Sequence, residues 1–179
     1  ACKEILAGQH HAEFPVDMIQ GGAGTTTNMN ANEVIANRAL QIMGHELGDY
    51  KHCSPNDHVN CSQSTNDAYP TAIHLGLYAT HLKFMEHYEL LIKSFEAKAE
   101  EFKDILKMGR TQLEDAVPMT LGQTFGAFAS ILRDEIRNIN FAAEEFLTVN
   151  MGATAIGTGI CSEPGYAEKC VAALSEITG

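Results

Sequence analysis

Three short polar clusters interrupt a chain that is otherwise patterned like a set of apolar helices. They occupy residues 24–28 (Gly-Thr-Thr-Thr-Asn), 64–67 (Ser-Thr-Asn-Asp) and 109–112 (Gly-Arg-Thr-Gln), and each lies at or just before a predicted helix start. Hydroxyl groups, amides and the free backbone N–H groups of a helix start can hold an anion without a cationic side chain. Three such clusters on one chain predict a small ligand that carries more than one carboxylate or phosphate.

Each cluster also has a purely structural interpretation, and local chemistry leaves both open. Ser, Thr, Asn and Asp are preferred helix caps, so residues 64–67 also fit a capped helix without a ligand. Residues 24–28 fit a glycine-rich loop, and Gly109 fits the C-cap of a turn between two helices. Neither residues 24–28 nor the glycine-rich stretch 152–159 has the lysine of a nucleotide-binding loop, so we expect no nucleotide and no other cofactor.

Composition limits the class of protein and the class of partner. The chain has 179 residues, 45% of them hydrophobic, which is enough for one domain with a core. Its net charge of −11 argues against nucleic acid or an acidic membrane surface as a partner. Five cysteines without a CxxC pair indicate a reduced, cytoplasmic protein. Both ends resemble cuts, since Ala1 opens the chain and residues 176–179 directly follow a predicted helix.

Four zinc-ligand residue types lie within ten positions, at His52, Cys53, His58 and Cys61. Their spacing is not that of a usual zinc finger, and adjacent ligands at positions 52 and 53 would be strained on one ion. We therefore expect no metal site there.

The apolar pattern predicts an all-α protein. Apolar residues recur in steps of three and four over a segment from Asp67 to about Met108, and again from Leu121 to Phe146. Shorter helices are expected from about Asn30 to Gly44 or Gly48, and over about 166–177. We expect the two longest to lie antiparallel in a bundle, with part of the first apolar stripe facing another chain or a missing segment.

Read in order, four stretches of the chain resemble the aspartase/fumarase superfamily: residues 20–34, 55–71, 109–123 and 150–159. The aspartases fit better than the fumarases, because fumarases typically carry His where this chain has Gln112 and because residues 149–155 resemble aspartase. Fumarases also commonly carry His where this chain has Ser54, in the superfamily's accessory carboxylate site. The resemblance implies a helical-bundle lyase core. Residues 1–48 would end an N-terminal domain with the first substrate-binding motif, and residues 49–179 would begin the central helical domain.

The resemblance also implies an activity, the elimination of ammonia from L-aspartate to give fumarate. Five residues match positions that hydrogen-bond the substrate, namely Thr25, Ser64, Thr65, Asn66 and Thr111, and Gln112 beside them is the candidate for specificity. The superfamily removes a proton from the carbon next to a carboxylate, which forms a doubly charged aci-carboxylate. Neutral donors held in place at helix starts suit this step, because they need no reorganisation as charge develops.

The superfamily's general base is a serine on a mobile loop, which would lie beyond the C-terminal end of this chain. We therefore expect no catalytic residue within the chain and no activity from it alone. The resemblance implies a homotetramer whose active sites are shared between subunits. Two alternatives stay open: fumarate hydratase or another lyase of the superfamily, and a non-catalytic helical oligomerisation module.

Overall fold

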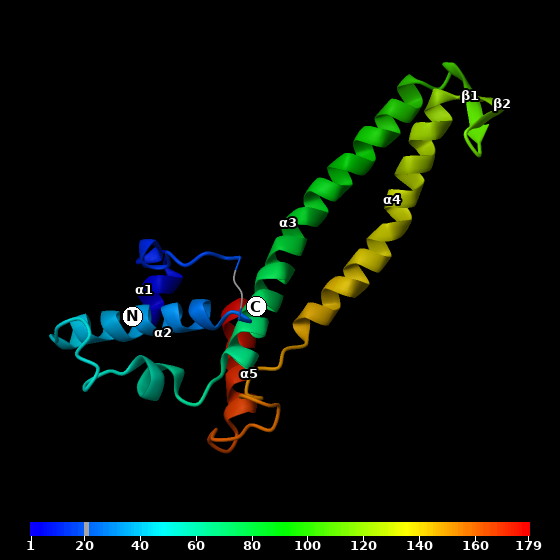
Figure 1. Ribbon diagram of the computed structural model, residues 1–179. Coiled ribbons are helices and arrows are strands. Elements are labelled where there is room, and N and C mark those ends of the chain that lie inside the picture. The colour runs from blue at the N-terminus through cyan, green and yellow to red at the C-terminus, as the bar shows by residue number, and fades with distance from the viewer. Residues whose placement is uncertain (20–21) are drawn as a thin grey trace. The chain divides into compact units, whose positions relative to one another are not determined.

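The computed structural model describes residues 1–19 and 22–179, which form two compact units (Figure 1). The first unit consists of Ala1–His74 with Val149–Gly179, and the second unit is Leu75–Thr148. Gln20 and Gly21, which open the first family motif, lie outside the described residues.

Most of the described chain is helical, which confirms the predicted all-α class. The elements in chain order are α1 (Cys2–Leu6), the 3-10 turn η1 (His11–Glu13), α2 (Thr25–Met43), the π-helical turn η2 (Pro55–Asn60), α3 (Thr65–Glu101), β1 (Leu106–Thr111), β2 (Glu114–Thr120), α4 (Leu121–Glu144), the 3-10 turn η3 (Glu145–Leu147) and α5 (Tyr166–Thr178). Within residues 1–19 and 22–179, no helix combines the length and the apolar character needed to cross a membrane.

In the first unit, α2 begins five residues earlier than predicted, at Thr25 rather than Asn30. The Thr-Thr-Thr-Asn run therefore forms the first turn of the helix instead of the loop before it. Gly24 precedes the helix with a φ of 85°, and a Cβ at this position would lie 2.2 Å from the ring of Tyr69. Only glycine fits there, because both the left-handed backbone and the close approach to Tyr69 exclude a side chain. The helix ends where predicted, at a left-handed Gly44.

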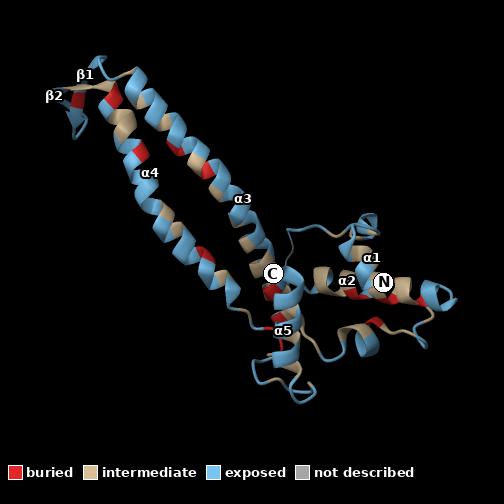
Figure 2. Cartoon of the chain, turned by 180° about the vertical axis from the view of Figure 1, so that it is seen from behind, coloured by how far each residue is buried: buried red, intermediate tan, exposed pale blue. Residues whose placement is uncertain are grey.

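In the second unit, α4 runs antiparallel to the part of α3 that begins at Leu75, as predicted. Phe102, directly after α3, packs against Phe125 of α4 with ring centroids 5.5 Å apart, and Nε2 of His81 donates a hydrogen bond to Oδ1 of Asn140 at 3.0 Å nearer the other end. Both views of the chain show the two helices side by side, and most of their surface is exposed (Figure 2). The pair is held by a narrow seam of aromatic contacts, by this hydrogen bond and by an ion pair between Glu96 and Arg133.

The predicted helix to Met108 is wrong at its end, because α3 stops at Glu101 and residues 106–120 form an antiparallel hairpin. Leu106 follows Phe102 by four residues and so continues the spacing of the helix, which means that periodicity does not mark the point where the helix ends. Thr111 pairs with Glu114, and the two turn residues Gln112 and Leu113 have φ values of 53° and 68°. Two left-handed residues make the tight primed turn that matches the twist of a hairpin.

The hairpin leads directly into α4 through a capping box. Thr120 accepts the backbone N–H of Gln123, and the Gln123 side chain accepts the backbone N–H of Thr120. Gly122, in the first turn of α4, lies against the end of α3, where a Cβ would come within 2.4 Å of the carbonyl oxygen of Ala99. The close approach of these two backbones fixes the hairpin to the helix pair.

Candidate functional site

The second polar cluster caps α3 through its own side chains. The hydroxyl of Ser64 accepts the backbone N–H of Asn66 at 3.1 Å, and Asp67 Oδ1 accepts the backbone N–H of Ser64 at 3.0 Å. This reciprocal arrangement is a capping box, so the structural interpretation of residues 64–67 is correct as far as Ser64 and Asp67 are concerned. It does not account for Thr65, which is half-buried, or for the side chain of Asn66.

Asp67 connects this cluster with the glycine-rich loop some 85 residues later in the chain. Its carboxylate is fully buried, and Oδ2 accepts the backbone N–H groups of Gly152 at 3.2 Å and Thr154 at 2.7 Å. Together with Ser64, three backbone N–H groups satisfy one buried charge. A buried carboxylate without such donors would be unstable, so this ion holds both segments in one arrangement.

Asn66 and Asn150 form a second link between the same two segments. The Asn66 amide donates to the carbonyl of Ala155 at 2.8 Å, and the Asn150 amide donates to the carbonyl of Asn66 at 2.9 Å. The second bond exists because Pro70, four residues after Asn66, has no N–H to bond that carbonyl within the helix. Pro70 inside α3 therefore leaves the carbonyl of Asn66 free to accept a hydrogen bond from the loop.

The first cluster lies in the same unit and is joined to the second through an amide network. Asn32 of α2, which is buried, donates to the Asn60 side chain at 3.0 Å, and Asn60 donates to the carbonyl of Gln63 at 2.6 Å. Thr25 begins the helix and is exposed, with its hydroxyl 3.3 Å from the carbonyl of Gly22. Four of the predicted binding residues, Thr25, Ser64, Thr65 and Asn66, therefore belong to one unit whose loops are tied together.

Thr111 and Gln112 belong to the second unit, at the tip of the hairpin. Both are exposed, and Gln112 has a left-handed backbone that is unfavourable for a residue with a side chain. Arg110 next to them pairs with Asp115, with Nε and Oδ1 3.1 Å apart. The guanidinium of Arg110 is thus engaged by its own hairpin.

Sequence reasoning missed three side chains that organise the first unit: Asn60, Asp67 as a loop anchor, and Asn150. It excluded residues 152–159 as a nucleotide-binding loop and did not connect them with residues 64–67. Pro70 close to the start of a long helix was the available signal, since a missing N–H frees a carbonyl that another group must satisfy.

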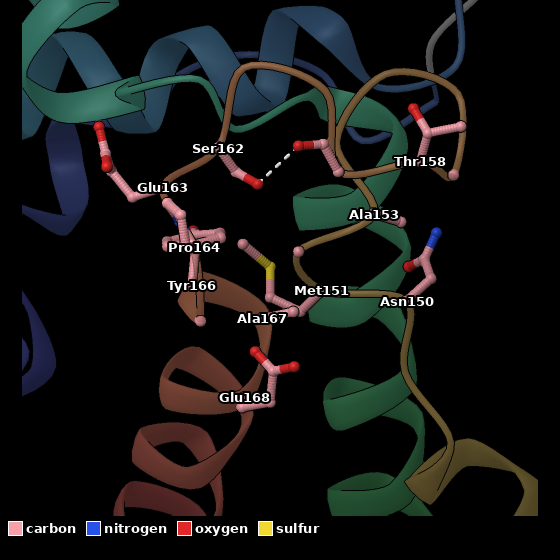
Figure 3. A pocket seen from close by; sticks show the side chains of 14 residues that line it. Asn150, Met151, Ala153, Thr158, Ser162, Glu163, Pro164, Tyr166, Ala167 and Glu168 are labelled. Atoms are coloured by element: carbon pink, nitrogen blue, oxygen red, sulfur yellow. Dashed lines mark hydrogen bonds between the residues drawn. The ribbon is translucent and has the colours of Figure 1, made fainter.

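A cavity of about 510 Å³ lies between the glycine-rich loop and the start of α5 (Figure 3). Glu163 and Glu168 line it together with Asn150 and Tyr166. Burial raises the pKa of the Tyr166 phenol above its ordinary range, and a hydrogen bond with Cys170 raises it further, so the phenol stays neutral. Two carboxylates beside this cavity make it unsuitable for a diacid, and none of the predicted binding residues lines it.

The four residues weighed as a zinc set do not form one cluster among the described residues. His58 instead accepts the backbone N–H of Ser54 through Nδ1 at 2.8 Å, which stabilises the start of η2. His52 lies with His45 and Asp49, and the ligand atoms of these three residues are within 4.8 Å of one another. The spacing His-x3-Asp-x2-His was visible in the sequence and was not singled out.

A family model described as "Lyase" matches residues 1–179, the whole chain. The chain belongs to the lyase family. This membership agrees with the resemblance found in the four motifs and with the helical fold.

Within the lyase family, the similar curated relatives are aspartate ammonia-lyases from several bacteria. The chain is 57% identical to that of Pseudomonas canavaninivorans, 54% to that of Escherichia coli strain K12 and 52% to that of Bacillus subtilis strain 168. Each match covers 100% of this chain and 38% of the relative. The chain therefore spans less than two fifths of the length of these relatives.

Two solved structures of the family share the fold. A fumarate lyase:delta crystallin from Brucella melitensis has a TM-score of 0.89 and 52% identity over 99% of this chain and 39% of its own. A class II fumarase from Schistosoma mansoni has a TM-score of 0.83 and 38% identity over 99% and 37%. Overall identity does not assign a role to a single side chain, so the six predicted site residues remain predictions.

Proposed function

We propose that the complete protein carrying this chain is an aspartate ammonia-lyase, which converts L-aspartate reversibly into fumarate and ammonia. The proposal is supported by identities of 52–57% over the whole chain to relatives that bear this name. A dicarboxylate substrate also agrees with three clusters of neutral donors on a chain whose own charge is −11.

The observation that best supports this function is the buried carboxylate of Asp67, which binds residue 64 and residues 152–154 at once. In our proposal this anchor keeps Ser64, Thr65 and Asn66 in a fixed position, so that their donors face a substrate carboxylate without moving. Thr25 adds a hydroxyl from the start of α2. Donors that are already oriented stabilise the aci-carboxylate more than the substrate, which lowers the barrier to proton removal.

We further propose that Thr111 and Gln112 complete the site from the hairpin tip. A left-handed Gln112 presents its side chain from a strained turn, and such strain is often kept where a ligand is contacted. Thr111 would donate to a substrate carboxylate, and Gln112 would distinguish an amino group from a hydroxyl. The general base would come from a segment that this chain does not include.

The second unit has many large apolar side chains exposed on α3 and α4, including Leu82, Leu90, Phe128 and Phe141. An exposed apolar face of this extent indicates a partner. We propose that it packs against other copies in a homotetramer with shared active sites. The division into an N-terminal domain ending near residue 48 and a central domain from residue 49, and a cytoplasmic location, belong to the same proposal.

The test is an assay of the complete protein with L-aspartate, following the ultraviolet absorbance of fumarate together with ammonia release. Both products are expected in equal amounts, and the 179-residue chain alone is expected to give neither. Fumarate hydratase is the second candidate, favoured by the likeness to the fumarase from Schistosoma mansoni. Malate formation from fumarate without ammonia-dependent aspartate formation would reject the first proposal and support the second.

A further inference from the structure

The loop that follows α2 brings two imidazoles and a carboxylate together. Oδ2 of Asp49 lies 4.0 Å from Nδ1 of His45 and 3.7 Å from Nε2 of His52. The two imidazole rings stack with centroids 3.9 Å apart and planes 7° from parallel. All three residues belong to the first unit and are separate from the residues proposed to bind the substrate.

The backbone of this loop is held in place at each of the three residues. His45 donates its N–H to the carbonyl of Leu40 at 2.9 Å, closing the end of α2. Asp49 and His52 follow in successive turns, with the N–H of His52 donating to the carbonyl of Asp49 at 3.0 Å.

A side chain of α2 adds a further restraint from outside the loop. The carbonyl oxygen of the Asn37 side chain accepts the N–H of Gly48 at 2.8 Å, and its amide donates to the hydroxyl of Tyr50 at 3.2 Å. The backbone of the loop is therefore fixed before any ligand arrives, while the two imidazoles can still turn about their side-chain bonds.

We propose that His45, Asp49 and His52 bind a divalent transition-metal ion of the zinc class. Two imidazole nitrogens and one carboxylate oxygen form a donor set that zinc commonly uses, with a fourth position open to water. Magnesium and calcium prefer all-oxygen ligands, so the two imidazoles select against them.

The observed distances are close to those a bound ion requires. Zinc lies about 2.0–2.2 Å from nitrogen and oxygen ligands, which places two ligands of a tetrahedral site roughly 3.4 Å apart. The two imidazole–carboxylate separations exceed this value by about 0.3 and 0.6 Å. The ligand atoms of all three residues lie within 4.8 Å of one another.

Parallel rings cannot both aim a lone pair at one ion, so binding requires the imidazoles to rotate apart. The side chains of His45 and His52 are 34% and 49% exposed, which leaves them free to turn without disturbing a core. The proposal therefore makes a specific structural demand: the ion must unstack the rings. An ordinary surface ion pair makes no such demand.

The test uses the complete protein, stripped of metal with a chelator and dialysed against Zn²⁺. The double variant His45→Gln/His52→Gln removes two ligands and is expected to bind one Zn²⁺ fewer per chain than the unaltered protein. Its affinity at this site should fall on the order of 100-fold or more, because even losing a residue that supports a ligand costs 10–100-fold. Lys51→Gln, in the same loop, is the matched control and should retain the ion.

Two further measurements separate this site from the five thiols, which also attract zinc. Co²⁺ bound by nitrogen and oxygen gives visible absorption without the near-ultraviolet band of a cobalt–thiolate bond, and the double variant should lose that visible component. Proton resonances of the His45 and His52 rings should shift as the stack opens. The proposal is overturned if the double variant and the unaltered protein bind the same number of Zn²⁺ ions, or if the ring resonances do not respond to Zn²⁺. Neither result depends on lyase activity.

Discussion

In the first unit, a fully buried carboxylate joins segments far apart in the sequence, whereas the second unit is two helices joined along a seam of phenylalanine rings. The buried polar side chains recorded for the described residues all belong to the first unit: Asn32, Asp67, Thr71 and Thr154. Hydrogen bonds are directional and allow one arrangement, while apolar contacts allow many partners. The hydrogen bonds of the first unit thus fix the positions of its donor groups, and the exposed apolar side chains of the second unit suit packing against other protein surfaces.

The largest effect is expected when the buried carboxylate that anchors the first unit is removed. Asp67→Asn places an NH₂ group where a carboxylate oxygen accepts a backbone N–H, so at least one buried donor loses its acceptor. We expect a local destabilisation of about 3 kcal/mol or more. Hydrogen exchange of peptides that cover residues 64–67 and 150–155, measured in the complete protein, should accelerate strongly.

Asp115→Asn is the matched control for that experiment. Asp115 is an exposed carboxylate paired with Arg110 on the hairpin, and exposed pairs of this kind contribute under about 1 kcal/mol. Equal exchange in the Asp67 and Asp115 variants would contradict the role of Asp67 as an anchor.

The hairpin tip offers a test of whether the second unit supplies a ligand contact. Thr111→Val in the complete protein removes one hydroxyl donor and keeps the size and β-branching of the side chain. Loss of one such donor typically costs 10²–10³-fold in turnover, and we expect about 100-fold. Thr111→Ser should keep most of the activity. Steady-state kinetics close to those of the unaltered protein in the valine variant would remove Thr111 from the site.

Two glycines of α4, in the second unit, differ in how closely α3 approaches them. Gly122→Ala would place a methyl group 2.4 Å from the carbonyl oxygen of Ala99, and backbone atoms cannot move aside cheaply. We expect a loss of about 1–3 kcal/mol, seen as a lower Tm of the complete protein. Gly126→Ala, one turn later, meets only the Ala99 Cβ at 3.8 Å and should be neutral or stabilising, since alanine favours helix. A lower Tm in both glycine variants would mean that other copies of the chain pack against this face of α4.

The smallest effect concerns a half-buried ion pair in the first unit. A hydrogen bond from Arg38 holds the pKa of Glu4 near 2, below its usual 4.5. A lowered folded-state pKa contributes stability above pH 4.5, and that contribution is lost as the pH falls from about 4.5 towards 2. Glu4→Gln should therefore lower Tm slightly at neutral pH and converge with the unaltered protein near pH 2. If the difference in Tm between the two proteins stayed the same across this pH range, Arg38 would not act through the charge of Glu4.

Much of the fold could be predicted because its signals are local. Apolar steps of three and four predicted α4 almost to its residue limits, and Gly44 predicted the end of α2 through the left-handed cap that glycine favours. The same signal failed at residues 106–120, since Leu106 also fits the spacing of the helix before it. There the pairing of Thr111 with Glu114 across a turn decided the structure.

By itself, the sequence determined the helical class, the order of the long helices and two polar clusters at helix starts, because each depends on residues within a few positions of one another. The third predicted helix start was wrong, since residues 109–112 lie in β1 and the hairpin turn. Only the tertiary structure decided that Asp67 satisfies Gly152 and Thr154, and that His52 lies with His45 and Asp49 rather than with Cys53 and His58. A buried charge takes whichever donors the folded chain brings to it, and side chains in a loop converge according to its turns. Neither outcome is encoded in spacing alone.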